Sequence, residues 1–380
     1  MWKLSHGVLL QVLRRLPADQ AIVLLADDTT DAKEADHVWG KTAHRDAVRS
    51  SGSRTHIKFG HKWLVVSVLV HVAGAARPWA LPIFSGLCRS PRFIRNWGGR
   101  PKTPAQLARQ FLIRLMRWLP DRKFVLIGDY GVIGHKAASF AHRHRDRVKV
   151  VSRMRGDANF YLPPKKKSRV KGGRTARKGR KAPSPREQAR TLPLQTCRVA
   201  WYGSSRRKRS YVTSTGLWYN KHGGQVTPIR WVGMHNDAGQ FTDYFYGSDD
   251  SIEPRRIIEY YAMRWNIEVT FEEVRAWLGL ESTRHWCKQS VLRVFPMLMG
   301  LFTAVSLIWQ ELSDSGHPVI LHNTPCYTKK AMTFADALFA VRRAIWERQV
   351  VVEHSPLGRC LTPLSRPTRE MLLTYLSAAA

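Results

Sequence analysis

The fold of this chain is decided by two apolar stretches, AIVLLAD at residues 21–27 and KFVLIGDY at residues 123–130. Each is short and continuously apolar, which is typical of a buried β-strand. An aspartate follows the apolar residues of each stretch, Asp27 in the first and Asp129 in the second. Acids at the carboxyl ends of core strands lie at the edge of the sheet where open α/β proteins bind ligands.

The residues between these strands predict an α/β fold. The stretch IKFGHKWLVVSVLVHV at 57–72 is long enough for one long strand or two. Thr103 followed by Pro104 is typical of a helix start and predicts an amphipathic helix that runs to about Leu119. We therefore expect residues 1–154 to form the first part of a core in which strands and helices alternate.

Between residues 155 and 250 the composition changes twice. Residues 155–194 are predicted to be a basic flexible loop, because the stretch 163–188 holds eleven Lys or Arg and one Glu without apolar periodicity. This loop is either a solvated linker or an arm that contacts phosphates. Residues 195–250 contain strand-like stretches with turn signals between them, which predicts an antiparallel β-rich insertion.

The chain becomes helical again beyond Pro254. The stretch PRRIIEYYAMRWNIEVTFEEVRAWLGL has helical character, and Gly279 is a predicted C-terminal stop. We expect residues 251–312 to complete the core and residues 313–380 to form a C-terminal helical region.

The charge of the chain points to a polyanion partner. Its 380 residues hold 62 Lys and Arg against 28 Asp and Glu, a formal net charge of +34, and 44% are hydrophobic. The apolar content supports a packed core, so the basic excess belongs to a folded body of the kind that binds nucleic acid. This excludes an ordinary cytosolic metabolic enzyme as the default. A ribosome-associated basic protein would share the charge but would give no role to the acids at the strand ends.

Cysteine usage and the lengths of the apolar runs bear on the compartment. The five cysteines are scattered and form no C-x-x-C pair, which argues against a disulfide framework or a zinc knuckle and fits a cytosolic protein. The longest apolar runs, at 63–70 and 295–309, are shorter than the roughly 17–25 residues that span a bilayer. We therefore expect no membrane partner.

A third carboxylate lies on the helix predicted after Pro254. At roughly 100° per residue, four residues of this helix fall in one sector about 60° wide and so share a face: Tyr261, Arg264, Glu268 and Arg275. Glu272 also joins this face. In one interpretation Glu268 and Glu272 pair with Arg264 and Arg275 as surface ion pairs at i,i+3 and i,i+4. In the other, one of these acids ligates a metal ion while the flanking arginines hold phosphate, which suits a chain that binds a polyanion.

These residues resemble the signature of a known family. The spacing Tyr261-(2)-Arg264-(3)-Glu268-(6)-Arg275 is similar to the Tyr-(2)-Arg-(3)-Glu-(6)-Lys signature of DDE transposases of bacterial insertion sequences, with Arg in place of the final Lys. The similarity covers nearly the whole chain. Three segments resemble those that carry the family's catalytic acids: LLADDTTDA at 24–32, RWLPDRKFVLIGDYG at 117–131 and RWNIEVTFEEVRAWLGLESTRHW at 264–286.

The resemblance implies an RNase H-like fold, that is, a mixed-sheet core with a β-rich insertion and a helical C-terminal part. It implies Asp27, Asp129 and Glu268 as the catalytic triad and as the metal ligands, with Asp28 as the alternative to Asp27. The implied cofactor is Mg²⁺, as two ions held by the three carboxylates, and Mn²⁺ can substitute.

The resemblance also implies the partner. Double-stranded DNA, both transposon ends and target, is the expected substrate of a homodimer in the bacterial cytoplasm, associated with the nucleoid. The expected DNA contacts are Tyr261, Arg264 and Arg275 from the signature, and Lys165, Lys166 and Lys167 from the basic loop.

The implied function is a DNA transposase that cleaves phosphodiesters at transposon ends and transfers the strands into target DNA. Family members usually carry a sizeable helical region before the first aspartate, and this chain has only 26 residues there. We therefore expect a truncated copy, or a chain whose end recognition has moved elsewhere. The alternative is a catalytically inactive or truncated remnant that acts only as a DNA-binding protein.

Overall fold

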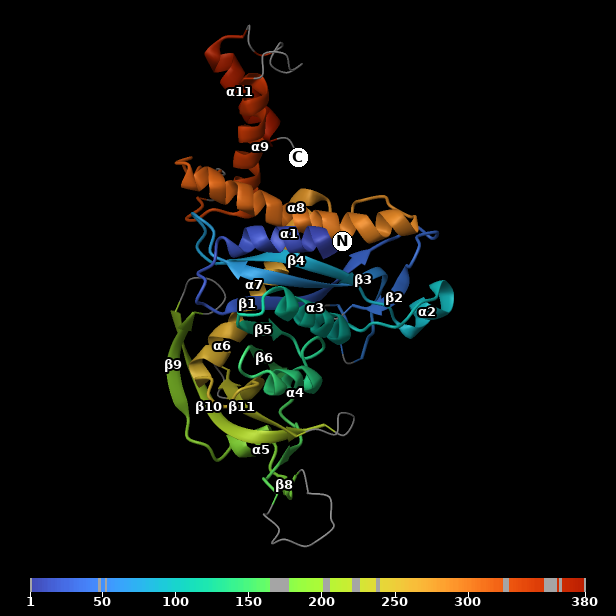
Figure 1. The fold of residues 1–380 in the computed structure, drawn as a ribbon, viewed down its shortest axis with the longest axis vertical. Coiled ribbons are helices and arrows are strands. Elements are labelled where there is room, and N and C mark those ends of the chain that lie inside the picture. Colours follow the sequence, from blue (N-terminus) through green and yellow to red (C-terminus); the bar gives the residue numbers. More distant parts are fainter. Residues whose placement is uncertain are drawn as a thin grey trace.

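The computed structural model has one mixed sheet at its centre, with helices packed around it (Figure 1). Among the residues that it describes, the strand order is β2-β3-β1-β5-β6-β12-β11-β10-β7-β8, with β4 pairing β3 and β9 pairing β10. This architecture confirms the expected α/β class, while the RNase H-like detail stays a prediction. The described residues are 2–46, 49–51, 53–164, 178–200, 206–220, 226–236, 240–323, 328–351, 361 and 364–378.

The first half of the sheet holds the core strands. β1, β5 and β6 run parallel to one another, and β3 runs antiparallel to β1. Every residue of β5 is buried, as its continuous apolar run predicts. These strands span Ile22–Ala32 (β1), Thr42–Arg45 (β2), Ile57–Val70 (β3), Trp79–Leu87 (β4), Phe124–Gly128 (β5) and Val148–Met154 (β6).

Two helices cover β4, which pairs with no other described strand than β3. Hydroxyl groups on these helices donate to the carbonyl oxygens of β4: Thr270 to Ala80 at 2.9 Å and Thr303 to Pro82 at 2.8 Å. These bonds satisfy two of the backbone carbonyl groups that β4 would otherwise leave unpaired at the edge of the sheet. The two helices span Trp265–Leu278 (α7) and Lys288–Asp314 (α8).

By length and composition alone, α8 could cross a membrane. In the structure it packs against β4, α1, α7 and α9. Its Phe295 stacks on Trp63 of β3, with ring centroids 4.6 Å apart and an angle of 2° between the planes. One face of α8 therefore packs on the sheet, while Met297 and Leu301 on the helix are exposed. The other helices of this half and of the C-terminal part are Trp2–Leu13 (α1), Pro91–Trp97 (α2), Pro104–Trp118 (α3), His135–Arg143 (α4), Phe334–Val351 (α9) and Arg366–Ala378 (α11).

The β-rich insertion continues the core sheet. Its last strand, β12, pairs antiparallel with β6, and β11 and β10 follow in turn. Because β6 would otherwise leave its backbone groups unpaired at an edge, this pairing extends one sheet across both parts of the chain. The insertion strands span Gln195–Ala200 (β9), Arg206–Tyr219 (β10), Val226–His235 (β11) and Phe241–Gly247 (β12).

Short elements form at both ends of the region 155–194, which we expected to be a loop. Phe160 is buried opposite Trp218 of β10, and this apolar contact anchors a short strand. Ser184 and Glu187 form a capping box that starts one helical turn. The elements are Phe160–Tyr161 (β7), Lys181–Ala182 (β8) and Pro185–Ala189 (α5).

Candidate active site

The two aspartates that end the apolar stretches lie side by side in the sheet. β1 and β5 are parallel neighbours, and Ala26 of β1 is paired with Gly128 of β5. Asp27 and Asp129 are the next residues of the two strands, so they lie at the same level of the sheet. Glycine permits this close approach, because a Cβ at position 128 would lie 2.5 Å from the carbonyl oxygen of Ala26. The register of two strands that are distant in sequence therefore brings these acids together.

The helical run after Pro254 divides into two helices with Arg264 at the junction. The helices are α6 (Pro254–Met263) and α7. The backbone N–H of Arg264 bonds to the carbonyl of Tyr261, three residues back, so the chain is wound more tightly here than in an α-helix. At the other end of α7, Gly279 adopts a left-handed conformation with φ 74°, as the predicted stop requires.

The side chain of Arg264 joins two of the carboxylates. Its Nη1 donates to Asp27 Oδ2 at 2.8 Å and to Glu268 Oε1 at 2.6 Å. The side chains of Arg264 and Asp27 are each 15% exposed, and that of Glu268 is 40% exposed. Arg264 Nε is buried and has no hydrogen-bond partner within the described part of the chain. The i,i+4 ion pair of the first interpretation, Arg264 with Glu268, is thus present. Arg264 also pairs with Asp27, which lies more than 200 residues earlier in the sequence.

Tyr261 holds the remaining acid. Its hydroxyl donates to Asp129 Oδ1 at 3.4 Å, and the backbone N–H of Tyr130 donates to the same oxygen at 2.9 Å. The Tyr261 ring packs on Phe245 of β12, with centroids 4.3 Å apart, and lies 5.5 Å from the Arg264 guanidinium. The β-rich insertion therefore supports this cluster through Phe245.

Burial governs the protonation of these groups. It raises the pKa of Asp27 to about 7, although the positive charge of Arg264 opposes the shift. Burial also raises the pKa of Tyr261 to about 12, and the charge of Asp129 adds to this effect. Burial alone would lower the pKa of Arg264, but Asp27 and Glu268 hold it above its usual range. Arg264 is therefore a cation, and Asp27 lacks enough positive charge around it to be fully ionised at neutral pH.

The carboxylate of Asp28 has a different partner. It pairs with Lys62 Nζ of β3 at 2.6 Å. Because successive side chains of a strand point to opposite faces, Asp27 reaches α7 while Asp28 does not. This geometry favours Asp27 over Asp28 as the first acid of the cluster.

The donors of the cluster fit a hard divalent cation. Asp27, Asp129 and Glu268 supply carboxylate oxygens, the ligands that Mg²⁺ prefers. As the side chains stand, no three His, Cys, Asp or Glu among the described residues form a metal-binding group. The guanidinium of Arg264 lies between Asp27 and Glu268, where a cation would bind. The three acids are thus of the chemical type that binds such an ion, while in this structure the Arg264 guanidinium stands between two of them.

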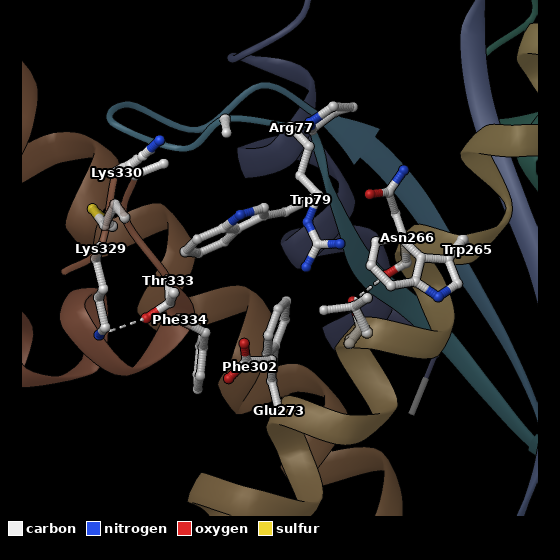
Figure 2. A pocket seen from close by; sticks show the side chains of 16 residues that line it. Arg77, Trp79, Trp265, Asn266, Glu273, Phe302, Lys329, Lys330, Thr333 and Phe334 are labelled. Atoms are coloured by element: carbon white, nitrogen blue, oxygen red, sulfur yellow. Dashed lines mark hydrogen bonds between the residues drawn. The ribbon is translucent and has the colours of Figure 1, made fainter. Parts of the chain in front are cut away.

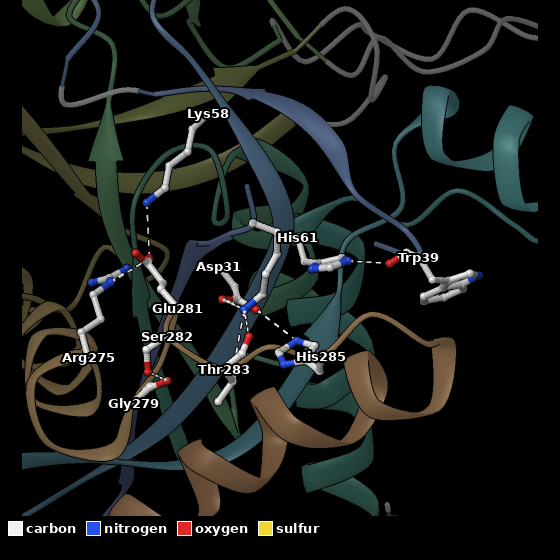
Figure 3. Close-up of polar contacts among 11 residues, drawn as sticks. Asp31, Trp39, Lys58, His61, Arg275, Gly279, Glu281, Ser282, Thr283 and His285 are labelled. Carbon is white, nitrogen blue, oxygen red and sulfur yellow. Dashed lines mark hydrogen bonds and ion pairs between the residues drawn. The ribbon is translucent and has the colours of Figure 1, made fainter. Parts of the chain in front are cut away.

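Arg275, the last residue of the signature, contacts β1 and the loop after α7. It donates from Nη2 to Thr29 Oγ1 at 2.7 Å. It also donates from Nε to Glu281 Oε1 at 3.0 Å, as Figure 3 shows. Sequence reasoning did not identify Thr29 or Glu281, although the period-two alternation of β1 puts Thr29 on the face of Asp27. Three further predicted DNA contacts lie outside the described residues: Lys165, Lys166 and Lys167.

A separate pocket of about 350 Å³ lies on the other side of α7 (Figure 2). Three of the α7 residues that line it, Asn266, Thr270 and Glu273, are about 140–160° around the helix from Glu268. The Arg77 guanidinium stacks over the ring of Trp265 at 4.5 Å. The pocket is thus distinct from the carboxylate cluster. Its lining includes Arg77, Trp79, Trp265, Asn266, Thr270, Glu273, Phe302, Lys329 and Phe334.

Comparison with known proteins gives a family. The model of the transposase DDE domain matches residues 103–305, more than half of the chain. A solved structure, the cryo-EM structure of the piggyBac transposase synaptic complex with hairpin DNA, is similar at a TM-score of 0.39 and 11% sequence identity. That match covers 93% of this chain and 57% of the solved chain, so this chain spans less than two thirds of its length. No curated protein matches the sequence.

Proposed function

Because the chain belongs to the transposase DDE domain family, we propose that it is a DNA transposase whose catalytic carboxylates are Asp27, Asp129 and Glu268. In the proposed reaction, water attacks a phosphodiester at the end of a mobile element and leaves a 3′-OH. This hydroxyl then attacks a phosphodiester of the target DNA in the same site, which joins the two DNAs.

The observation that carries this assignment is the contact of Arg264 with two acids that come from different elements. An ion pair along α7 would account for Arg264 and Glu268, and it would contribute little to stability because Glu268 is 40% exposed. Such an ion pair does not account for Asp27. Burial of the Asp27 carboxyl group disfavours its charged form and raises its pKa to about 7. Carboxylates with such raised pKa values gather at functional sites.

Two Mg²⁺ ions, or Mn²⁺ in their place, would supply activation of the attacking oxygen and stabilisation of the leaving one. Asp27, Asp129 and Glu268 would hold these ions through their carboxylate oxygens. Tyr261 keeps Asp129 in position through its hydroxyl group. The low exposure of Asp27 strengthens its attraction for a cation, because fewer water molecules screen the charge.

Arg264 has two roles in this proposal. Without metal, its guanidinium pairs with both Asp27 and Glu268. With metal and DNA present, the guanidinium is released and can donate to the oxygens of the phosphodiester, for which its planar fork is suited. The Nε that lacks a partner among the described residues is one of the donors available for this contact.

The ribbon of β9 and β10 supports duplex DNA as the partner. Its register places Arg198 directly opposite Lys208, with the exposed Arg206 and Arg207 next along β10. Like charges opposite each other destabilise a sheet, so an anionic partner would relieve this repulsion. We propose that a homodimer uses this surface on transposon ends and target DNA, in the bacterial cytoplasm with the nucleoid.

A nicking assay on supercoiled plasmid with Mg²⁺ or Mn²⁺ tests the function. The wild-type chain should convert the plasmid to nicked or linear forms. Asp27→Asn, Asp129→Asn and Glu268→Gln, which keep shape but lose charge, should each reduce the rate at least about 1000-fold, within the range that single catalytic groups contribute. Asp28→Asn is the matched control and should keep most of the activity.

DNA binding by the same variants completes this test. All of them should still bind a short duplex in gel shift at least as tightly as the wild type. The acids act in the cleavage reaction, and removal of a carboxylate beside Arg264 leaves its guanidinium freer to contact phosphate. Nicking by Glu268→Gln at the wild-type rate would contradict the triad. Binding by the wild type without any cleavage would identify a non-catalytic DNA-binding remnant.

A further inference from the structure

The carboxylate of Glu281 holds two basic side chains from different elements (Figure 3). Its Oε1 accepts from Lys58 Nζ of β3 at 3.3 Å and from Arg275 Nε of α7 at 3.0 Å. Arg275 also donates to the hydroxyl of Thr29 on β1. The side chain of Glu281 is 25% exposed, and those of Lys58 and Arg275 are each 34% exposed. Solvent, and therefore a ligand, can reach all three charged groups.

The backbone at Glu281 is in an unfavourable conformation. Its φ of 75° is the only positive one at a non-glycine position among the described residues. A residue with a Cβ pays for this conformation, which glycine adopts freely. Such strain persists where the surroundings impose it, and it is concentrated at ligand-binding sites. Here the strained residue carries the carboxylate that lies between Lys58 and Arg275.

The cluster lies beside the proposed catalytic strand. Asp27 and Thr29 are two residues apart on the same face of β1, so Thr29 lies about 7 Å further along the strand at about 3.3 Å per residue. Arg275 donates to the hydroxyl of Thr29, and Lys58 and Arg275 both pair with the Glu281 carboxylate. A DNA strand with its reacting phosphate at Asp27 would therefore bring a neighbouring phosphate close to these donors.

We propose that Lys58, Arg275 and Thr29 form a binding site for a DNA phosphate, and that the Glu281 carboxylate fills this site when DNA is absent. The inference rests on the proposed function, because it takes the DNA strand to pass Asp27. A carboxylate and a phosphate accept from the same charged donors. Since the ion pairs of Glu281 are partly exposed, they are weak and can be exchanged. Glu281 thus competes with DNA and lowers the affinity of the free protein for it.

Glu281→Gln tests the competition, with Glu347→Gln as matched control. Glu347 pairs with Arg343 on α9, so both variants raise the net charge equally, but only one frees Lys58 and Arg275. The measurement is the Kd for a 20-bp fluorescent duplex by anisotropy, with EDTA, over a series of KCl concentrations. Glu281→Gln should tighten binding about 3- to 10-fold at low salt and increase the slope of log Kd against log salt by about 1. Glu347→Gln should change Kd less than about 2-fold.

Two further variants show whether a change in DNA binding comes from the lost carboxylate and not from a folding defect. Glu281→Gly also removes the carboxylate but tolerates the positive φ, so it should keep the thermal stability of the wild type and bind DNA more tightly as well. Adding Lys58→Ala to Glu281→Gln should cancel most of the gain. Binding by both Glu281 variants that is no tighter than that of Glu347→Gln would overturn the proposal.

The binding results for the Glu281 variants can be distinguished from a failure of the proposed transposase function. The binding assay contains no divalent ion, so it does not depend on cleavage. Unchanged binding of the Glu281 variants alongside metal-dependent nicking would remove the phosphate site and leave the transposase. Tighter binding alongside absent nicking would keep the phosphate site and remove the catalytic role.

Discussion

Replacing Asp27 by Asn should stabilise the metal-free protein while it abolishes cleavage. The pKa of Asp27 is about 7 in the folded protein against an ordinary value of 3.8, because burial disfavours the charged form. The folded protein therefore binds this proton more tightly than the unfolded chain does, and the free energy of unfolding falls as the pH rises from about 4 to about 7. At about 1.4 kcal/mol per pKa unit, the buried charge costs about 4 kcal/mol above pH 7. About 3 kcal/mol of this cost develops between pH 5 and pH 8.

The assay is guanidinium unfolding of wild type and Asp27→Asn in EDTA, at pH 5 and at pH 8. Asn lacks the titration, so the stability advantage of the variant should grow by about 3 kcal/mol between the two pH values. Comparing the two chains removes the effects of all other titrating groups.

The control is Asp28→Asn, which breaks only the partly exposed pair with Lys62 and should cost less than about 1 kcal/mol. Mg²⁺ added at pH 8 should stabilise the wild type more than Asp27→Asn, because the proposed metal site exists only in the folded protein and includes the Asp27 carboxylate. The same pH dependence in wild type and Asp27→Asn would refute the burial argument.

Two other expectations concern the core and the DNA surface. Trp63→Ala removes a buried ring that stacks on Phe295, and it should lower the free energy of unfolding by about 3–5 kcal/mol in chemical denaturation; a loss below about 1 kcal/mol would mean that the ring is not tightly packed. Lys208→Ala removes an exposed charge from the β9–β10 ribbon, and it should weaken duplex binding and reduce the salt slope by about 1 in anisotropy titrations. An unchanged slope would place the ribbon away from the DNA.

Local patterns predicted much of the fold, because they depend on neighbours in the sequence. The continuous apolar run of β5 and the stop at Gly279 are present where the pattern places them. The Arg264–Glu268 contact likewise follows from a separation of four residues on a helix. The structure differs where a contact joins distant segments, as when β12 pairs with β6 and turns the insertion into part of the core sheet.

The sequence by itself determined the α/β class and the types and spacing of the candidate acids, since apolar periodicity and helical spacing act over a few residues. Only the tertiary structure decided their partners. Asp27 lies with Arg264, and Asp28 with Lys62, because the pleat of β1 turns adjacent side chains to opposite faces of a sheet whose neighbours come from remote parts of the chain. Glu281 meets Lys58 and Arg275 for the same reason: strand register and helix docking fix distances that no local spacing encodes.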